Sequence, residues 1–525
     1  MHRYRRLGLA TLLLLSALPL AAQLSPVGTP KGSLRFDIQG AFQSADRRLF
    51  EGQTEDYLAD FGSSAFGSNR MPLLKPADTL VGAILGQPGY RLNLGDQQSH
   101  GQLTVGTGTI GAALGVTSKL TLFADIPFVT TRVQARIRID STRGDAGLNP
   151  AHPELGDPGS QGQADAFFTS FDNALSTLQT QINGGTYSGS LDSLARAVES
   201  RGTALRDALF SLTRDPIQAS PFVPTLASTT GQQILARVRG LQDTLANTLS
   251  VSGSGFGDPV LAASRVTDNQ FREVVSSASG PVQAFPLAEA KISRMGDMDV
   301  GAVYTLVDRF DRHGTSGGFR FAVTGLLRLP TGLRDDPNNL LDVGTGNGRY
   351  EVGVSGTADL GSGRWGSRLT GGYLLRLASL RVRRVSDLGA PYAAIGTRTN
   401  VRLDAGNILD LGAKPFFRLA RNIALHGLVS YTRIGADAVS YNSPGDAIAG
   451  VPASVLGEGQ RTAVAVGGGI SYVGRASHEC ETGHRCGWPI DASWNYSTVV
   501  TGTGGRVNKF RTTQLEIRWY QRLWR

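Results

Sequence analysis

The chain has 525 residues, of which 67 are glycine and only 18% are charged, and its mean hydropathy is −0.11. Its 52 Lys and Arg residues outnumber its 43 Asp and Glu residues by nine. The basic residues are scattered along the chain rather than gathered into the stripe that a nucleic-acid-binding surface needs, so nucleic acid is not an expected partner. This composition is compatible with several soluble domains or with one large β structure.

The start of the chain has the features of a secretory signal peptide. Three arginines precede an apolar run from Leu7 to Leu20, and two alanines then offer small residues for cleavage before Gln23. We therefore expect residues 1–22 to be a signal peptide and the mature chain to start near Gln23. No later stretch reaches the roughly 18 apolar residues of a membrane helix, so strands would have to embed the protein in a membrane.

Much of the mature chain alternates apolar and polar residues with a period of two, which is typical of β-strands. From Phe319 to Leu329, apolar side chains occupy one face, and the arginines at 320 and 328 occupy the other. A wall between lipid and a wet lumen requires two such faces. We find about 12 segments of this kind, near residues 33–43, 101–115, 118–132, 297–308, 318–330, 348–361, 364–380, 407–419, 421–435, 460–473, 488–502 and 507–523.

The links between these segments alternate in length. The odd-numbered links begin with residues 44–100 and 133–296 and are mostly long, whereas even-numbered links such as 361–364 are mostly short. The exception is the turn that contains both cysteines, residues 474–487. If the last strand runs down to the periplasm, the long links are external. The sequence therefore predicts an all-β fold, a transmembrane antiparallel β-barrel of about 12 strands, with barrel strands in residues 23–135 and 296–525.

Two insertions interrupt the barrel pattern. Residues 44–100 show little periodicity and are predicted to form an irregular loop or an inward-folded plug. Residues 136–295 contain three apolar stripes with helical spacing, which begin at Phe167, Leu191 and Ile234. Helices of this kind hide their stripes against one another, so we expect a large α-helical insertion on the extracellular side, folded as an antiparallel hairpin or small bundle.

Several motifs resemble those of a known family. They are GDMDVGAVY at 296–304, LRLPTG at 327–332, DIPFV at 125–129 and RWG at 364–366. Together they resemble the outer-membrane proteins named for the meta pathway of phenol degradation, which are related in fold to long-chain fatty-acid transport barrels. The resemblance implies passage of small or hydrophobic organic compounds across the outer membrane. It also implies outer-membrane lipid and the barrel assembly machinery as partners.

Charged residues on the inward strand faces indicate what the lumen contains. They either form an ion-pair network that packs the interior or line a constriction for charged solutes. A strongly apolar interior is absent, so an apolar binding pocket would have to come from the insertions. The lumen-lining candidates are Arg320, Arg328, Arg368, Arg376, Lys414, Arg418, Glu516 and Arg518.

One short segment contains both cysteines of the chain, Cys480 and Cys486. In an exported protein a local disulfide between them is the expected state. His478 and His484 lie beside them and would complete a set of four zinc ligands, but the spacing matches no standard zinc module. We therefore expect a disulfide and no metal.

Two further groups of residues have simple explanations. The acidic residues Asp335, Asp336 and Asp342 do not have EF-hand spacing, and are expected to form a solvated loop or to screen the pore mouth. His426 and Ser430 share a strand face but lie roughly 13 Å apart at the 3.3 Å rise of a strand, which excludes a direct hydrogen bond. We therefore expect neither an enzyme nor a cofactor.

The sequence predicts a porin-like channel or facilitator for small, in part hydrophobic, organic compounds. Its expected location is the cell outer membrane of a Gram-negative-type bacterium, because the leader exports it and strands embed it. The alternative is a structural or surface-interaction barrel whose helical insertion binds a partner and through which nothing passes.

Overall fold

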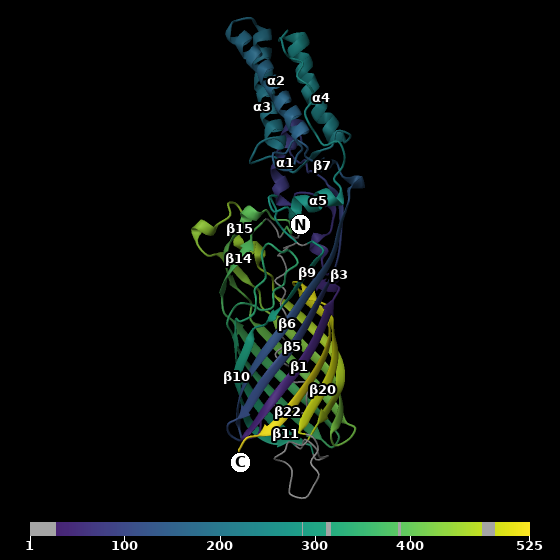
Figure 1. Cartoon of the computed structure of the whole chain (residues 1–525), viewed down its shortest axis with the longest axis vertical. Coiled ribbons are helices and arrows are strands. Elements are labelled where there is room, and N and C mark those ends of the chain that lie inside the picture. The colour runs from purple at the N-terminus through teal and green to yellow at the C-terminus, as the bar shows by residue number, and fades with distance from the viewer. Residues whose placement is uncertain (1–27, 286, 311–316, 387–389, 475–488, 525) are drawn as a thin grey trace.

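The computed structural model describes residues 28–285, 287–310, 317–386, 390–474 and 489–524. The predicted signal peptide and the predicted disulfide between Cys480 and Cys486 lie outside the described residues. Figure 1 shows a β-barrel with the last strand ending at its lower end, and with loops and helices above its upper end.

Antiparallel strands close into a barrel. In the described part of the chain the main sheet has 14 strands, of which the short β4 (Ser63–Phe66) and β9 (Glu289–Met295) only extend its upper edge. The remaining twelve form a ring that the pairing of β5 with β6 closes, which confirms the predicted fold and strand number. They are β1 (Ser33–Ala45), β5 (Gly95–Gly115), β6 (Leu120–Asp140), β10 (Met298–Phe310), β11 (Gly318–Leu329), β12 (Glu351–Ser362), β13 (Trp365–Arg376), β16 (Ile408–Arg418), β17 (Ile423–Ile434), β19 (Arg461–Val473), β20 (Ile490–Gly504) and β22 (Arg511–Arg522).

The two rims of the barrel differ in the length of their links. The strand β1 begins and β22 ends at one rim, which we call the lower rim, because Ser33 pairs with Arg522. Links at this rim are short, except for residues 474–489 between β19 and β20. Between β12 and β13 the tight turn places Gly363 at a φ of 57°, which favours glycine. Links at the upper rim are mostly long and include residues 141–288. The predicted alternation of link lengths is therefore confirmed for most links, with the predicted exception between β19 and β20.

The outer face of the barrel is apolar. Exposed aliphatic side chains form its middle band, among them Ile38, Leu369 and Val429. Near the lower rim aromatic side chains form a girdle, in which the rings of Trp365 and Phe417 lie 4.6 Å apart. A strand of 12 residues such as β11, tilted as in known barrels, rises about 30 Å, enough to cross the apolar band of an outer membrane. This surface is that of a membrane-spanning barrel.

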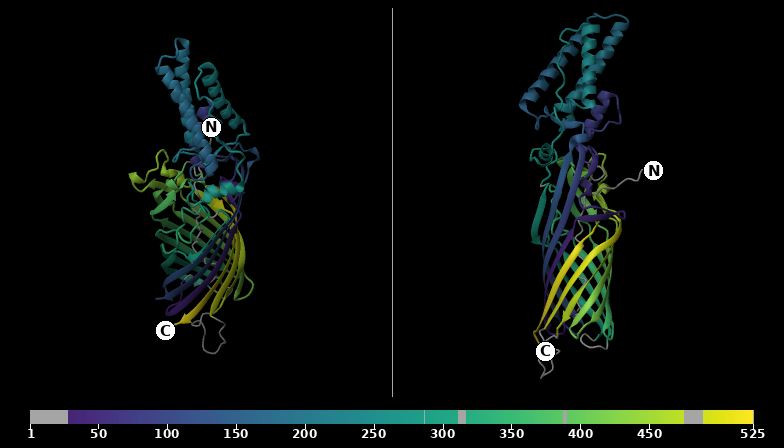
Figure 2. Two further views of the ribbon diagram at one scale, coloured as in Figure 1. Left: turned by 45° about the horizontal axis from the view of Figure 1, so that its top comes forward. Right: turned by 90° about the vertical axis from the view of Figure 1, so that its right-hand side faces the viewer.

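The helical insertion extends the molecule above the upper rim, as Figures 1 and 2 show from three directions. It contains α2 (Pro158–Asn183), α3 (Ser190–Thr213) and α4 (Thr229–Asp243), which coincide with the three predicted stripes. Their apolar faces share one buried core, which includes Phe171, Leu178, Val198, Leu209, Ile234 and Val238. Among the described residues, no helix is both long and apolar enough to cross a membrane.

Residues 44–100 are more regular than their sequence indicates. They contain β2 (Arg47–Phe50), β3 (Gln53–Asp56) and the helix α1 (Lys75–Leu85). Pro76 did not prevent this helix, because it lies in the first turn, where a proline removes no helical hydrogen bond. Val81 of α1 is buried in the same core as the helical insertion, so tertiary packing supports α1.

A second buried core joins the links above the barrel. Phe66, Phe271 of α5 (Asp268–Ser276) and Tyr392 pack edge to face, with ring centroids between 5.2 and 5.6 Å apart. Aromatic contacts of this kind fix the links relative to one another. The other short elements are β7 (Ala146–Leu148), β8 (Phe222–Pro224), β14 (Ser379–Arg384), β15 (Arg398–Asp404), β18 (Ala438–Tyr441), β21 (Val507–Asn508), a π-helical turn (Thr244–Thr248) and the 3-10 turns η1 (Ala59–Phe61), η2 (Pro72–Leu74), η3 (Ser141–Arg143), η6 (Ile395–Thr397), η7 (Pro444–Asp446) and η8 (Ala453–Leu456).

Candidate functional site

The lumen is lined by the strand faces that lie opposite the apolar outer face. All of the charged residues that the sequence suggested for the lumen are buried inside the barrel wall: Arg320, Arg328, Arg368, Arg376, Lys414, Arg418, Glu516 and Arg518. Their outward neighbours, such as Phe319, Leu327 and Leu375, are exposed. The alternation along each strand accounts for this separation.

Small polar side chains line the middle of the lumen. They are half-buried, in contrast to the fully buried charged residues below and above them. We call this region the central chamber. Its lining includes Gln39, Thr107, Thr109, Thr324, Ser355, Thr357, Thr370, Ser430, Thr432, Ser497 and Gln514.

Below the chamber lies a lower charged layer, built around one carboxylate. Asp359 of β12 accepts hydrogen bonds from Arg320 Nε at 2.7 Å and from Arg368 Nε at 2.6 Å. Arg320 also lies over the ring of Phe310, with 5.0 Å between the guanidinium carbon and the ring centroid. Charge-assisted hydrogen bonds and cation–π contacts therefore hold this half of the layer together.

The other half of the lower layer is also paired. Arg518 Nε donates to Glu516 Oε1 at 2.7 Å, and Lys414 Nζ donates to Asn495 Oδ1 at 3.4 Å. Arg418 Nη1 donates to the carbonyl of Gly363 at 3.2 Å. The side chains of this layer are therefore packed against partners rather than free in the lumen.

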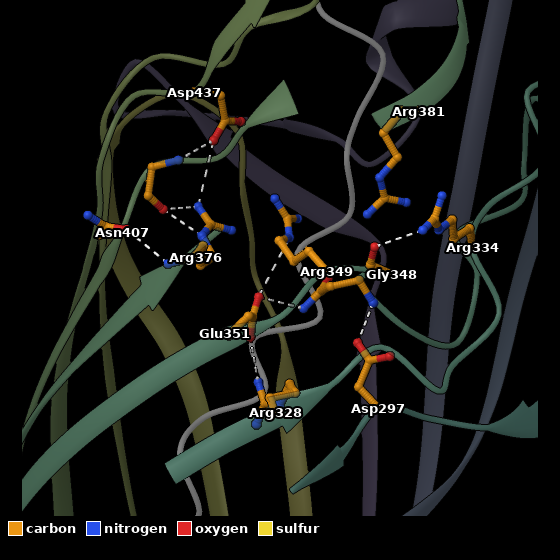
Figure 3. A network of polar contacts seen from close by, with 12 residues as sticks. Asp297, Arg328, Arg334, Gly348, Arg349, Glu351, Arg376, Arg381, Asn407 and Asp437 are labelled. Atoms are coloured by element: carbon orange, nitrogen blue, oxygen red, sulfur yellow. Dashed lines mark hydrogen bonds and ion pairs between the residues drawn. The ribbon is translucent and has the colours of Figure 1, made fainter. Parts of the chain in front are cut away.

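Above the chamber lies an upper charged layer (Figure 3). Arg328 forms two parallel hydrogen bonds with Asp299, of 2.7 and 2.8 Å, and its Nη1 donates to Glu351 Oε2 at 3.0 Å. Arg376 Nε donates to the carbonyl of Gly406 at 2.6 Å. Of the predicted lumen residues, Arg328 and Arg376 thus belong to the upper layer, and the other six lie in the lower layer.

Residues 330–350 fold over the upper mouth because Asp297 holds them there. Its carboxylate accepts the backbone amides of Gly332 at 2.9 Å and Asn347 at 2.5 Å. The hydroxyl of Thr345 donates to the carbonyl of Met295 at 3.0 Å. The motif GDMDVGAVY at 296–304 therefore contributes a loop anchor, Asp297, as well as strand residues.

A cavity of about 90 Å³ lies between the upper links. Its apolar lining includes Leu58, Phe61, Leu340, Leu341 and Pro391, which come from three separate links. The sequence suggested that any apolar pocket would come from the insertions, but only part of this lining, such as Leu58 and Phe61, belongs to one of them, and most of it comes from residues 335–343 and 383–393. Its polar lining comprises Arg48, Asp60, Asp335, Asp336, Asn339, Asp342, Arg383 and Arg384.

The acidic residues at 335, 336 and 342 have partners within the protein: an arginine binds Asp335, and backbone amides donate to Asp336 and Asp342. Arg383 binds both carboxylate oxygens of Asp335: its Nη1 lies 2.6 Å from Oδ2, and its Nη2 donates to Oδ1 at 3.0 Å. Burial raises the pKa of Asp342, and burial together with the nearby Arg383 lowers the pKa of Arg381 to about 10. Within the described ranges, no group of His, Cys, Asp and Glu side chains is placed to hold a metal ion.

Sequence reasoning missed Arg349, Arg381 and Asp437, which contribute to the upper mouth. Arg349 and Asp437 lie in links outside the barrel strands, and Arg381 lies in the small sheet of β14, β15 and β18. Alternation along barrel strands carries no signal for such positions. His426, which was weighed as a partner of Ser430, instead has its Nε2 2.7 Å from Asn495 Oδ1.

The closed ring of strands, the apolar outer face and the polar lumen define a transmembrane β-barrel of the outer-membrane type. No protein-family model and no curated protein matches the sequence. Among solved structures, the chain is similar to an outer membrane channel from Pseudomonas putida F1, with 10% identity over 95% of this chain and 100% of that chain and a TM-score of 0.40.

Two other solved structures show the same kind of likeness. A Pseudomonas aeruginosa FadL homologue has 8% identity over 94% of this chain and 90% of that chain, with a TM-score of 0.25. The translocator domain of the autotransporter NalP from Neisseria meningitidis has 8% identity over 95% of this chain and 90% of that chain, with a TM-score of 0.28. The class of the protein therefore rests on its own strands and surfaces.

Proposed function

We propose that this protein is a passive channel or facilitator that carries small organic compounds across the outer membrane of a Gram-negative-type bacterium. The observation that carries the proposal is the central chamber, where Ser, Thr and Gln side chains are half-buried inside a closed wall. A lumen that served only as structural packing would be filled by larger side chains, as in small barrels. A wet polar interior behind an apolar wall is instead typical of a conduit.

In this proposal the solute meets four regions in turn. The cavity between the upper links offers apolar side chains for a hydrophobic part of the solute, and the upper charged layer follows. The chamber then leads to the lower charged layer, where Arg320, Asp359 and Arg368 are paired. These side chains must separate or rotate for passage, so we expect slow and selective permeation.

The test is solute flux into liposomes that contain the full-length folded protein. We expect arabinose, a small neutral solute, to swell these liposomes faster than protein-free ones. Thr370→Trp places a bulky ring in the chamber and should lower the flux several-fold. Leu369→Trp is the matched control, because this neighbouring side chain is exposed on the lipid face and does not enter the lumen.

The outcome decides between the channel and a barrel that only displays its helical insertion. Absence of arabinose flux through correctly folded protein would refute the channel. Equal flux for Thr370→Trp and Leu369→Trp would show that any permeation does not pass through the chamber.

A further inference from the structure

The upper mouth of the lumen contains three buried arginines, and for each of them the paired carboxylate lies 3.6 Å away and is bound more closely by another donor. They are Arg349 in the link before β12, Arg376 at the end of β13 and Arg381 in β14, with 2%, 2% and 5% of their surface exposed. Figure 3 shows Arg349 between the other two, with the guanidinium groups of Arg349 and Arg381 turned toward the same space. We call these three residues the arginine cluster.

The carboxylate nearest to Arg349 is already engaged. The distance from Arg349 Nε to Glu351 Oε1 is 3.6 Å, which is too long for a hydrogen bond. Glu351 Oε2 accepts a 3.0 Å hydrogen bond from Arg328. In the described part of the chain, Nε and Nη1 of Arg349 are buried without a hydrogen-bond acceptor.

The same arrangement occurs at Arg376. Its Nη2 lies 3.6 Å from Asp437 Oδ1, and that oxygen accepts the backbone amide of Gly406 at 2.9 Å. Arg376 is held instead by the neutral carbonyl of Gly406. Its side chain is therefore fixed in place by a neutral acceptor, and its contact with the carboxylate of Asp437 is a long one of 3.6 Å.

Arg381 repeats the pattern a third time. Its Nη1 lies 3.6 Å from Asp335 Oδ1, whereas Arg383 binds the same carboxylate at 2.6 Å. Among the described residues, Nε of Arg381 has no acceptor. Burial and repulsion from Arg383 lower the pKa of Arg381 to about 10, so the group is still protonated at neutral pH.

Buried guanidinium donors without acceptors, as at Arg349 and Arg381 in the described part of the chain, are costly, and an anion would satisfy them. Arginine suits a carboxylate in particular, because its planar donors match the two carboxylate oxygens. The apolar cavity between the upper links adjoins the cluster, since Asp335 lines that cavity and also faces Arg381. An anion bound here could therefore place a small apolar body against neighbouring apolar side chains.

We propose that the arginine cluster of Arg349, Arg376 and Arg381 binds the carboxylate of a small organic acid with an apolar body at the upper mouth of the lumen. This inference rests on the proposed function, because it names the class of solute that the proposed channel selects. The binding step itself does not require that the lumen be open.

Binding can be measured by calorimetry on the full-length protein in detergent, with benzoate as the probe and benzamide as its neutral counterpart. Benzoate should bind, and benzamide should bind at least about tenfold more weakly, because it cannot form charge-assisted hydrogen bonds. Arg349→Gln and Arg381→Gln should each weaken benzoate binding about tenfold. Arg349→Lys keeps the charge but loses the planar donors, so its affinity should fall between those of the wild type and Arg349→Gln.

Arg402→Gln is the matched control, because Arg402 is an exposed arginine of the same small sheet, paired in register with Leu380. It should leave benzoate binding unchanged. Each variant is first checked for folding by its heat-dependent migration in gels, so that loss of binding cannot be confused with loss of the barrel.

Equal affinity for benzoate and benzamide would overturn the anion site. So would unchanged benzoate binding in folded Arg349→Gln and Arg381→Gln. Arabinose flux tests the channel separately. Benzoate binding without arabinose flux supports the anion site and refutes the channel. Arabinose flux without benzoate binding supports the channel and refutes the anion site.

Discussion

Arg320 and Asp359 lie opposite each other on the adjacent strands β11 and β12, and Arg320 Nε donates to Asp359 Oδ2 at 2.7 Å inside the barrel. The two residues are 2% and 1% exposed. Arg368 of β13 is also in register with Asp359 and binds the same carboxylate. One aspartate thus joins three consecutive strands and is the centre of the lower charged layer.

This relationship predicts that Asp359→Asn destabilises the barrel. The change leaves two buried guanidinium groups facing a neutral amide, and breaking a buried ion pair costs roughly 3–5 kcal/mol. The free energy of unfolding, followed in urea by the gel migration of unheated protein, should fall by about that amount. Asp404→Asn is the control, since Asp404 is exposed in β15, and should change stability by less than about 0.5 kcal/mol. Equal stability of both variants would show that the lower layer does not hold the strands.

The upper charged layer predicts a change in ion selectivity. Replacing Arg328 and Arg376 with Gln removes two cations from the upper mouth and leaves Asp299 and Glu351 without Arg328 as a partner. The reversal potential across a KCl gradient in planar bilayers should then shift toward cations, because buried charges act strongly within a low-dielectric wall. Folding of the double variant must be checked first. A reversal potential equal to that of the wild type would mean that ions do not pass these residues.

The position of the helical insertion predicts where proteases cut intact cells. The connection after α3 is accessible, since Ile217 is 93% exposed. If the upper rim faces the outside, proteinase K added to intact cells should cleave near Ile217 and give two fragments on a denaturing gel. Cleavage that requires a permeabilised outer membrane would place the insertion in the periplasm and invert the topology.

The two cysteines are predicted to be joined. Cys480 and Cys486 are separated by five residues, and exported proteins mature in an oxidising compartment. Mass spectrometry without reductant should give a peptide lighter by two hydrogens than the reduced form. Recovery of two free thiols from protein isolated under acid quench would contradict this prediction. Cys480→Ser should remove the mass difference without affecting the gel migration of the folded barrel.

The sequence predicted the barrel well because the signal for a strand is local. Each wall strand separates lipid from water, so every second side chain must be apolar, as from Phe319 to Leu329. The same alternation put Arg320 and Arg328 on the buried face. Helical stripes in residues 136–295 were equally clear, because a helix that packs on others repeats its apolar residues every three to four positions.

The links were harder to predict, because their contacts have no period. Residues 44–100 contain α1, which Pro72, Pro76 and Pro88 obscured and which packing against the helical insertion supports. The anchoring of residues 330–350 by Asp297 depends on backbone amides 35 and 50 positions away. Such contacts leave no local pattern in the sequence.

By itself, the sequence determined that this chain forms a membrane barrel of about 12 strands with charged residues inside. Each wall strand faces lipid on one side and the lumen on the other, so apolar and polar side chains alternate along it. Only the tertiary structure decided which carboxylate each arginine meets. Arg349, Arg376 and Arg381 come from separate segments, and each lies 3.6 Å from a carboxylate that another donor binds more closely. The physical reason is that pairing in a lumen depends on how folded links converge at the mouth, and this is set by packing across the whole chain.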